Sequence, residues 1–380
     1  MLRNSCPRRS KVGVYRTEEK GRTEAMESPH ERALREIEEV FGDRLKQGPA
    51  PPGVPDAGDA LASASPMSAE EVEFLAEVAG RYSLPLVALG AGTASTPEPE
   101  TGSILIHFDL MRGLRLPEHN EPWVEAEPGA SWLQLDDLLR ARGWGLAVYP
   151  TSAPRATVGG WLTQDGLGVG SFEYGWLSEN VLSVSVVLPG GERREVPGED
   201  LRSFVEPGKG GAIVVGAKLR TRRVDGDVPF ATTFSDADDL AGCVVRLSRS
   251  GVPLWHLAFV NPVMARARKL EEDYLLFGAY PQERAPEVEA GLRGAMEPHR
   301  GRILAAAQAH RVWGERFFPV APSHPIPSPM VRELTSVEEL PEALGRESFR
   351  PEHTALQGTV GRSAEVLLLA IGEPEEGWAR

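Results

Sequence analysis

The sequence predicts an α+β fold divided into two domains, and three observations lead to this. The chain has 380 residues, more than a single typical core accommodates. As far as Arg223, short strand-like runs mix with amphipathic helical segments, and glycine-rich loops follow the strands. From Val228 onward, longer helical segments alternate with strands. We therefore expect one domain at residues 28–223 and a second α+β domain at residues 224–380.

Residues 1–27 are polar and basic and lack the apolar run of ~7–15 residues that a secretory signal contains. We expect them to be a disordered leader, or else residues upstream of a true start near Met26. A helix should begin directly after them, because Ser28 and Glu31 have the spacing of a capping box around Pro29.

The same rules place the elements that follow. Ser68 and Glu71 are spaced as a second capping box, and Ser131 precedes a third helix that Gly143 ends. A hairpin is expected at the Gly190–Gly191 turn, between an apolar strand and a charged returning strand. Further strands are expected at residues 86–89, 103–111, 123–129, 212–223 and 254–260.

Composition excludes several classes of function. The formal net charge is −14, which argues against binding to nucleic acid or to an anionic membrane. No run of ~18 apolar residues is found, so we expect no transmembrane helix. The two cysteines, Cys6 and Cys243, cannot by themselves build a disulfide framework, a zinc site or an iron–sulfur cluster. A reducing cytoplasm is the expected location.

The stretch Leu84–Glu100, "LPLVALGAGTASTPEPE", places a glycine-rich turn after a strand. A dinucleotide-binding turn of the Rossmann type requires a helix directly afterwards, and Pro97 and Pro99 prevent one here. The loop therefore joins strand to strand. Two interpretations remain open: an anion-binding nest of backbone amides with hydroxyl donors, or a tight strand connection.

A second glycine-rich segment, Tyr149–Val181, is rich in hydroxyl side chains and poor in charge. Such a segment favours a large, flat, partly polar ligand, because glycine lets the backbone approach closely. A third glycine-rich piece, Glu206–Gly216, runs into a strand. For each single glycine the alternative is an ordinary turn.

The order of these pieces resembles the FAD-linked oxidases of the vanillyl-alcohol oxidase/para-cresol methylhydroxylase (PCMH-type) family, in particular the glycolate oxidase/D-lactate dehydrogenase branch. The resemblance covers about residues 31–223. It is carried by four blocks: Pro85–Ser95, Val124–Gly129, the segment from Pro150 through Thr157–Gly160, Thr163, Gly166 and Tyr174–Gly175 to Asn180–Val181, and Gly208–Val214.

The resemblance implies a PCMH-type FAD-binding domain of two α+β subdomains, followed by an α+β cap domain over the substrate. It implies that the backbone of the first loop holds the FAD pyrophosphate, and that the later blocks line the ribityl chain and flavin ring. The implied cofactor-binding residues are Gly90, Ala91, Gly92, Thr93, Ala94, Ser95, Thr96, Pro150, Thr157, Gly159, Gly160, Thr163, Gly166, Tyr174, Ile213 and Val214.

The sequence departs from that family at several points. It has no His-x-Gly-Asp-Gly-Asn stretch near its C-terminus, and its eight histidines are scattered, so we predict no metal. The first loop carries no histidine for a covalent link, so FAD should be noncovalent. Leu89 stands where an arginine is usual, and the chain ends soon after the last predicted strand.

The cap region offers few candidates for catalysis. Arg316 is a candidate anchor for a substrate carboxylate, with a surface salt bridge as the alternative. His310 and His324 are candidate bases, with structural roles as the alternative. We expect the remaining notable residues to be structural: Trp313, Phe317, Phe318 and Cys243 in the core, and Glu70–Glu71 and Asp136–Asp137 on solvated faces.

These features lead to one functional hypothesis and two alternatives. The first is an FAD-dependent oxidoreductase that oxidises a small 2-hydroxy acid, of the glycolate or D-lactate type, by hydride transfer to flavin. The second is an FAD-binding accessory subunit of a glycolate oxidase-like complex, working with an iron–sulfur or second flavoprotein subunit and peripheral at the inner membrane through that partner. The third is a domain whose catalysis has decayed.

Overall fold

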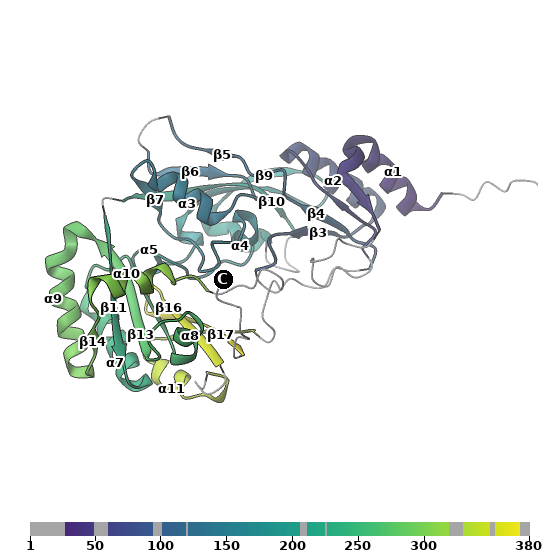
Figure 1. Cartoon of the computed structure of the whole chain (residues 1–380). Coiled ribbons are helices and arrows are strands. Elements are labelled where there is room, and N and C mark those ends of the chain that lie inside the picture. Colours follow the sequence, from purple (N-terminus) through teal and green to yellow (C-terminus); the bar gives the residue numbers. More distant parts are fainter. Residues whose placement is uncertain are drawn as a thin grey trace, which may run out of the picture.

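The computed structural model describes residues 27–48, 60–93, 101–118, 121–205, 211–224, 226–318, 330–349 and 354–372. Nearly all of the predicted leader therefore lies outside the described residues. In the described part of the chain, three β-sheets with flanking helices form two bodies, and the second, cap body lies below the first in Figure 1.

The first sheet has the strand order β1-β2-β4-β3, in which β2, β4 and β3 are parallel and β1 is antiparallel to β2. Ala33, Ile37 and Phe41 of the first helix and Val72 and Leu75 of the second are buried in this subdomain's core. The elements are α1 (Pro29–Phe41), β1 (Leu45–Gln47), β2 (Ala62–Ala64), α2 (Ala69–Tyr82), β3 (Leu86–Leu89) and β4 (Ile104–His107).

The capping box predicted at Ser28 is confirmed. The amide of Glu31 donates to Ser28 Oγ at 3.2 Å, and the Ser28 amide donates to Glu31 Oε2 at 2.7 Å. The second box is only half formed. The Glu71 amide donates to Ser68 Oγ at 3.4 Å, but the Glu71 carboxylate is drawn away to pair with Arg44.

The second sheet has the order β5-β6-β10-β8-β9, with β7 paired to the far end of β10. The predicted hairpin is confirmed, since β8 and β9 pair across Gly190 and Gly191, which have φ values of 95° and 94°. The elements are β5 (Leu114–Arg115), β6 (Trp123–Ala126), α3 (Trp132–Arg140), β7 (Trp144–Leu146), α4 (Val158–Leu162), α5 (Ser171–Tyr174), β8 (Val181–Val187), β9 (Arg193–Pro197), α6 (Leu201–Val205) and β10 (Ile213–Arg223).

The third sheet is antiparallel throughout, with the order β14-β11-β13-β12-β16-β17-β15. Alternate residues of its strands face opposite sides: Leu257 and Phe259 join the core under α7, α9 and α11, while Ala258 and Val260 join the core under α8 and α10. The elements are β11 (Asp227–Phe234), α7 (Ala237–Ser250), β12 (His256–Val260), α8 (Pro262–Ala267), β13 (Tyr274–Pro281), α9 (Ala285–Met296), β14 (Arg302–Ile303), α10 (Ala306–Gly314), β15 (Met330–Ser336), α11 (Leu340–Leu344), β16 (Thr354–Val360) and β17 (Glu365–Gly372).

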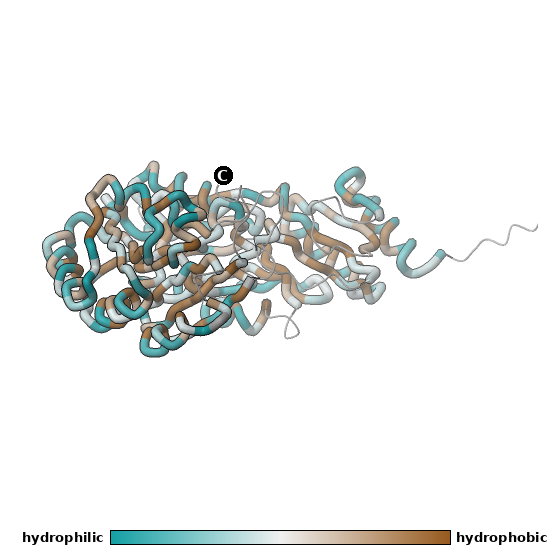
Figure 2. Tube along the Cα trace, turned by 60° about the horizontal axis from the view of Figure 1, so that its bottom comes forward, coloured by the Kyte–Doolittle hydropathy of each residue, from teal (hydrophilic) through white to brown (hydrophobic). Residues whose placement is uncertain are grey.

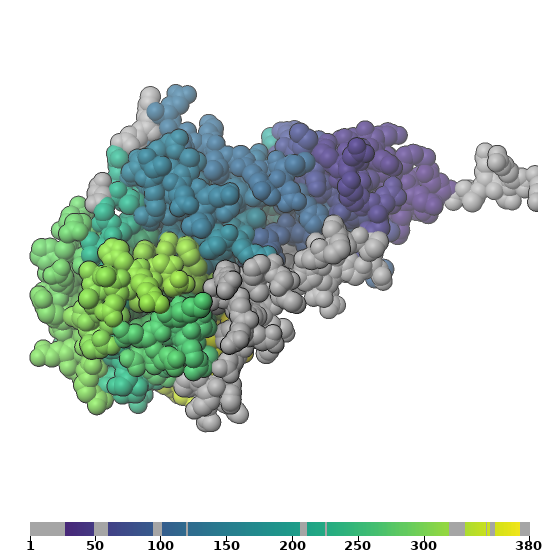
Figure 3. Space-filling view, viewed as in Figure 1, coloured from purple at the N-terminus to yellow at the C-terminus, as the bar shows by residue number. Residues whose placement is uncertain are grey.

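The two bodies meet along a broad junction (Figure 3). Near the crossing from β10 to β11, Arg222 pairs with both carboxylate oxygens of Asp227, at 2.9 and 2.7 Å, and lies 3.6 Å from the ring centre of Trp255. Arg140 adds a bond to Asp227 at 3.1 Å. Although burial opposes the charge, these two arginines hold the pKa of Asp227 below its ordinary value. Charged contacts thus fix the start of the cap against the first body.

Apolar segments gather in the interior of both bodies, and hydrophilic segments mark much of the outer helices (Figure 2). Among the described residues, no helix is long and apolar enough to cross a membrane.

Candidate functional site

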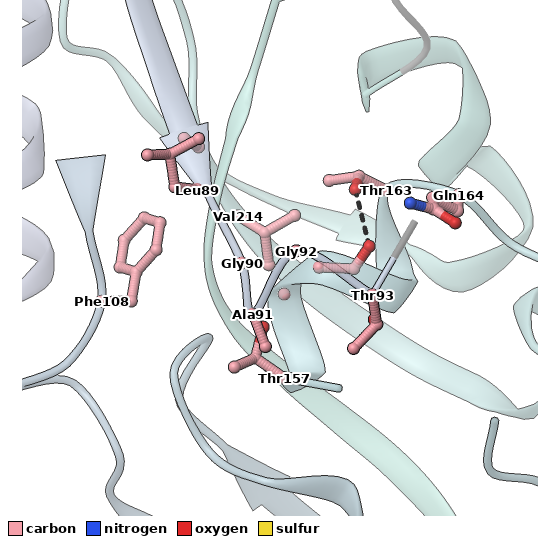
Figure 4. A pocket seen from close by; sticks show the side chains of 13 residues that line it. Leu89, Gly90, Ala91, Gly92, Thr93, Phe108, Thr157, Thr163, Gln164 and Val214 are labelled. Carbon is pink, nitrogen blue, oxygen red and sulfur yellow. Dashed lines mark hydrogen bonds between the residues drawn. The ribbon is translucent and has the colours of Figure 1, made fainter. Parts of the chain in front are cut away.

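A pocket opens where the first two sheets meet. Its lining comes from the loop after β3, the start of β10 and the region of α4. Figure 4 shows Phe108 at one end of this first pocket and Gln164 at the other. Its lining residues are Ala88, Leu89, Gly90, Ala91, Gly92, Thr93, Phe108, Thr157, Gly159, Gly160, Thr163, Gln164 and Val214.

The glycines of this pocket are required by close backbone approaches. A Cβ atom on Gly90 would lie 3.2 Å from Gly160 Cα and 3.0 Å from Thr157 Oγ1. A Cβ atom on Gly159 would lie 2.8 Å from the Pro128 side chain. Gly92 has a φ of 63°, in the left-handed region that favours glycine. The loop after β3 therefore packs directly on α4, and a larger residue at Gly90 would require its neighbours to shift.

The polar groups that line the first pocket are neutral, as far as its described residues go. They are backbone amides and the side chains of Thr93, Thr157, Thr163 and Gln164. The Thr163 hydroxyl donates to the Gly160 carbonyl at 3.0 Å (Figure 4), and this bond fixes its orientation. Such a lining suits a ligand whose anionic part is held by backbone and hydroxyl donors.

A second pocket shares Thr93, Gly160 and Gln164 with the first, so the two are contiguous. It lies between the bodies, because strands β15 and β17 of the cap form one of its walls. Its lining residues are Thr93, Pro150, Thr151, Ser152, Gly160, Trp161, Gln164, Leu167, Phe318, Arg332, Leu367 and Leu369.

The structure brings most of the predicted cofactor-binding residues together. Pro150 lines the second pocket. The predicted residues that line the first pocket are Gly90, Ala91, Gly92, Thr93, Thr157, Gly159, Gly160, Thr163 and Val214. Gly166 lies beside the Arg332 side chain at the edge of the second pocket. Tyr174 packs against the core of the second sheet, and Ile213 belongs to the core of the first sheet. Ala94, Ser95 and Thr96 lie outside the described residues.

The predicted site residues omitted the cap wall and several residues near the glycine loops, among them Gln164 and Phe108. Gln164 was within reach of prediction, because it follows Thr163 in a segment already assigned to the cofactor. Phe108 and Arg332 carried no local signal. They come to the pockets through strand pairing, β3 with β4 and β15 with β17.

Arg316 is placed beside the junction and is not among the residues that line either pocket. Its Nε donates to the Tyr149 hydroxyl at 3.2 Å, and its Nη1 donates to the Trp313 carbonyl at 3.0 Å. Its guanidinium lies 4.2 Å from the ring centre of Phe317. These contacts bind Arg316 to protein groups of both bodies, as a structural residue does.

His256 is the most perturbed histidine in the described chain. It is fully buried on β12, where its Nδ1 accepts a hydrogen bond from the Gly170 amide at 3.3 Å and its Nε2 has no partner. Burial, with a smaller contribution from Arg316, lowers its pKa to about 3. His256 is therefore neutral at ordinary pH and links the cap to the first body.

The expectation of a solvated Asp136–Asp137 face is wrong for Asp136. Its side chain is 1% exposed and accepts from Arg140 Nε at 2.6 Å and from the Leu146 amide at 2.9 Å. It turns inward because it anchors β7 to α3. Asp137 is exposed as expected.

The structure also shows the burial of the remaining residues that the sequence analysis singled out. Cys243 is buried, and burial raises the pKa of its thiol to about 12. Phe318 is buried, while Trp313 and Phe317 are half-buried. His310 is exposed on α10, and His324 lies outside the described residues. In the described ranges, no group of three or more His, Cys, Asp or Glu side chains could hold a metal.

Comparison with known proteins identifies the first body. Residues 60–197 match the model of the FAD binding domain family. This part of the chain is an FAD-binding domain. The match spans both glycine segments that form the first pocket, and FAD is the cofactor that such a domain binds. The resemblance drawn from the sequence motifs is confirmed for this domain.

Two similar sequences are D-lactate dehydrogenases. The mitochondrial cytochrome-type enzyme of Arabidopsis thaliana is 26% identical over 53% of this chain and 37% of its own length. The enzyme of Archaeoglobus fulgidus is 27% identical over 58% of this chain and 53% of its own length. The D-2-hydroxyglutarate dehydrogenase of Escherichia coli is 35% identical over 33% of this chain and 13% of its own length. The chain thus matches about half or less of these relatives.

Solved structures extend the likeness of fold to the cap. p-Cresol methylhydroxylase with substrate bound matches with a TM-score of 0.70 at 13% identity, over 90% of this chain and 82% of that one. Alkyldihydroxyacetonephosphate synthase matches with a TM-score of 0.69 at 16% identity, over 91% and 81%. The predicted fold class, a PCMH-type FAD-binding domain followed by an α+β cap, is confirmed.

Proposed function

We propose that the chain is an FAD-dependent oxidoreductase that oxidises a small 2-hydroxy acid of the glycolate or D-lactate type. The supporting observation is the contiguity of the two pockets. A cofactor held by the glycine loops would extend past Gly160 and Gln164 into the second pocket, against the cap wall. The names of the similar dehydrogenases favour this class of substrate.

The lining of the first pocket fits FAD. The backbone of Gly90–Thr93 would hold the pyrophosphate without covalent linkage, and Thr157, Gly159 and Gly160 would support the adjoining part of the cofactor. When bound, FAD would supply the hydride acceptor. The chain's own residues orient the substrate carbon and exclude water, and the apolar wall of Leu167, Leu367 and Leu369 serves the second purpose.

One observation favours the accessory-subunit alternative. Oxidation of a hydroxy acid requires a base for the hydroxyl proton. Among the described residues that line either pocket, none is His, Asp, Glu, Lys, Tyr or Cys. An FAD-binding subunit that works with an iron–sulfur or second flavoprotein subunit would need no such base.

A single experiment tests both. The purified full chain should be yellow, and glycolate or D-lactate added without oxygen should bleach the flavin band at about one equivalent of acid per flavin. A colourless protein would remove the FAD proposal. A yellow protein that none of a series of 2-hydroxy acids bleaches would replace the enzyme with the accessory subunit.

A further inference from the structure

Arg332 has an unusual position at the junction of the two bodies. Among the described lining residues of both pockets, it is the only one that carries a charge. It stands on β15, the edge strand of the cap sheet, and its exposed side chain lines the second pocket, whose other polar side chains are neutral. The surrounding apolar side chains are Trp161, Leu167, Phe318, Leu367 and Leu369.

The protein holds the Arg332 guanidinium through one nitrogen. Nη2 donates to the backbone carbonyl of Asp165 at 2.9 Å. A guanidinium has five N–H donors, and within the described ranges this is the one hydrogen bond that the Arg332 side chain makes. No carboxylate in those ranges forms an ion pair with it. The remaining donors and the positive charge are thus free for a ligand.

The Asp165 carboxylate forms no ion pair with Arg332, because it accepts hydrogen bonds from other groups. It accepts from the Gly166 amide at 2.8 Å, and from the Ser178 amide and hydroxyl at 3.1 and 2.8 Å. The residue is 3% exposed and has a φ of 51°. This turn directs the Asp165 backbone carbonyl at Arg332. The carbonyl positions the guanidinium but does not neutralise its positive charge.

We propose that Arg332 binds the carboxylate of a small monocarboxylic acid in the second pocket. This deepens the proposed function and rests on it. A guanidinium remains protonated at all ordinary pH values and matches a carboxylate with two parallel hydrogen bonds. Arg316 does not compete for this role, because it is bound to Tyr149 and Trp313.

The same geometry limits the substrate class. One guanidinium neutralises one carboxylate. A second carboxylate on the ligand would find no counter-charge among the described lining residues, whose other polar side chains are the neutral Thr93, Thr151, Ser152 and Gln164, and partial burial of an unpaired charge is unfavourable. The pocket therefore selects acids with one carboxylate and a short apolar side chain over dicarboxylic acids.

Unreactive acids test this binding without turnover. In isothermal titration of the purified full chain, we expect propionate to bind, 1-propanol not to bind, and succinate to bind at least about tenfold more weakly than propionate. Arg332→Gln should weaken propionate binding roughly 10- to 100-fold, since it removes charged hydrogen bonds. Arg332→Lys should recover part of that loss, because it restores the charge without the planar fork.

Arg346→Gln is the matched control. Arg346 pairs with Glu333 next to Arg332 in sequence but lines neither pocket, so its loss should leave propionate affinity unchanged. Thermal melting of each variant checks folding. If Arg332→Gln unfolds, the comparison of Arg332→Lys with wild type decides in its place. A wild-type chain that does not bind propionate would overturn the proposal.

Two further outcomes separate this inference from the proposed function. If propionate binds through Arg332 but no 2-hydroxy acid bleaches the flavin anaerobically, the oxidoreductase proposal fails and the carboxylate site stands. If Arg332→Gln binds propionate like the wild type but has a shifted flavin reduction potential, Arg332 acts on the cofactor and the carboxylate site is overturned.

Discussion

The two walls of the combined pocket are built by opposite means. The wall in the FAD-binding domain depends on missing atoms: a Cβ on Gly90 would lie only 3.2 Å from Gly160 Cα, and a Cβ on either glycine would lie 3.0 Å from Thr157 Oγ1. The wall in the cap depends on side chains, with the leucines of β17 and the single guanidinium of Arg332. The first wall should therefore fail abruptly when an atom is added. In the cap wall, ligand affinity should change gradually as the charge or shape of a side chain is changed.

The largest expected effect on cofactor binding is on the first wall. Gly90→Val would put Cβ 3.2 Å from Gly160 Cα and 3.0 Å from Thr157 Oγ1, with two further methyl groups beyond it. The neighbouring backbone cannot yield easily, so the loop must move, at a cost of about 1–3 kcal/mol. We expect the purified variant to lose most of its FAD, measured as the flavin-to-protein absorbance ratio.

Gly294→Ala in α9 is the control for that change. A Cβ there meets nothing within 4 Å, and alanine favours a helix more than glycine does by roughly 1 kcal/mol. It should keep full FAD. If Gly90→Val also keeps full FAD, then the first wall is adaptable and the contrast between the walls is wrong.

The next prediction concerns the stability of the first body next to the second pocket. Asp136 anchors β7 just before the segment that supplies Pro150 and Thr151. Asp136→Asn removes one of the two buried carboxylates that bind Arg140 and leaves it Asp227, so it should reduce the free energy of unfolding by about 1.5–3 kcal/mol. Its neighbour offers the control, since Asp137 is exposed and Asp137→Asn should change stability by less than about 0.5 kcal/mol. Equal values from urea unfolding would contradict the buried role.

The contrast between the walls also explains what the sequence could predict. The first wall is made by local chain segments, so Gly90–Thr93 and Thr157–Thr163 could be found from their glycine and hydroxyl patterns. Phe108 and Arg332 depend on pairings between distant strands, which no local pattern reveals. Asp136 was misassigned because one acidic residue beside another resembles a solvated helix face. Only the position of the Leu146 amide shows that it turns inward.

His256 tests the contact between the cap and the first body through the pH dependence of stability. Its pKa is about 3 in the fold, lowered from an ordinary 6.5. Between these values the unfolded chain binds a proton that the folded chain does not, so stability falls as pH decreases from about 6.5 towards 3. At pH 5 the loss due to His256 should be about 2 kcal/mol relative to pH 7.5. Urea unfolding at both pH values measures it.

Replacement of His256 by glutamine should remove that contribution. The His256→Gln variant should show a shallower fall of stability from pH 7.5 to pH 5 than the wild type. His310→Gln on the surface of α10 should leave the pH dependence as it was, because His310 is exposed. An unchanged pH profile in His256→Gln would mean that other groups cause the acid sensitivity of the junction.

The smallest expected effect is on FAD affinity at Gly92. It distinguishes backbone conformation from crowding as the reason for a glycine there. Gly92 has a φ of 63°, and an alanine in the left-handed region costs about 1 kcal/mol. Gly92→Ala should therefore weaken FAD binding about fivefold, measured by titrating FAD into the apoprotein. Asparagine tolerates this conformation better, so Gly92→Asn should bind FAD more tightly than Gly92→Ala although its side chain is larger. The reverse order would show that crowding, and not backbone conformation, requires glycine at residue 92, as crowding against Gly160 and Thr157 does at residue 90.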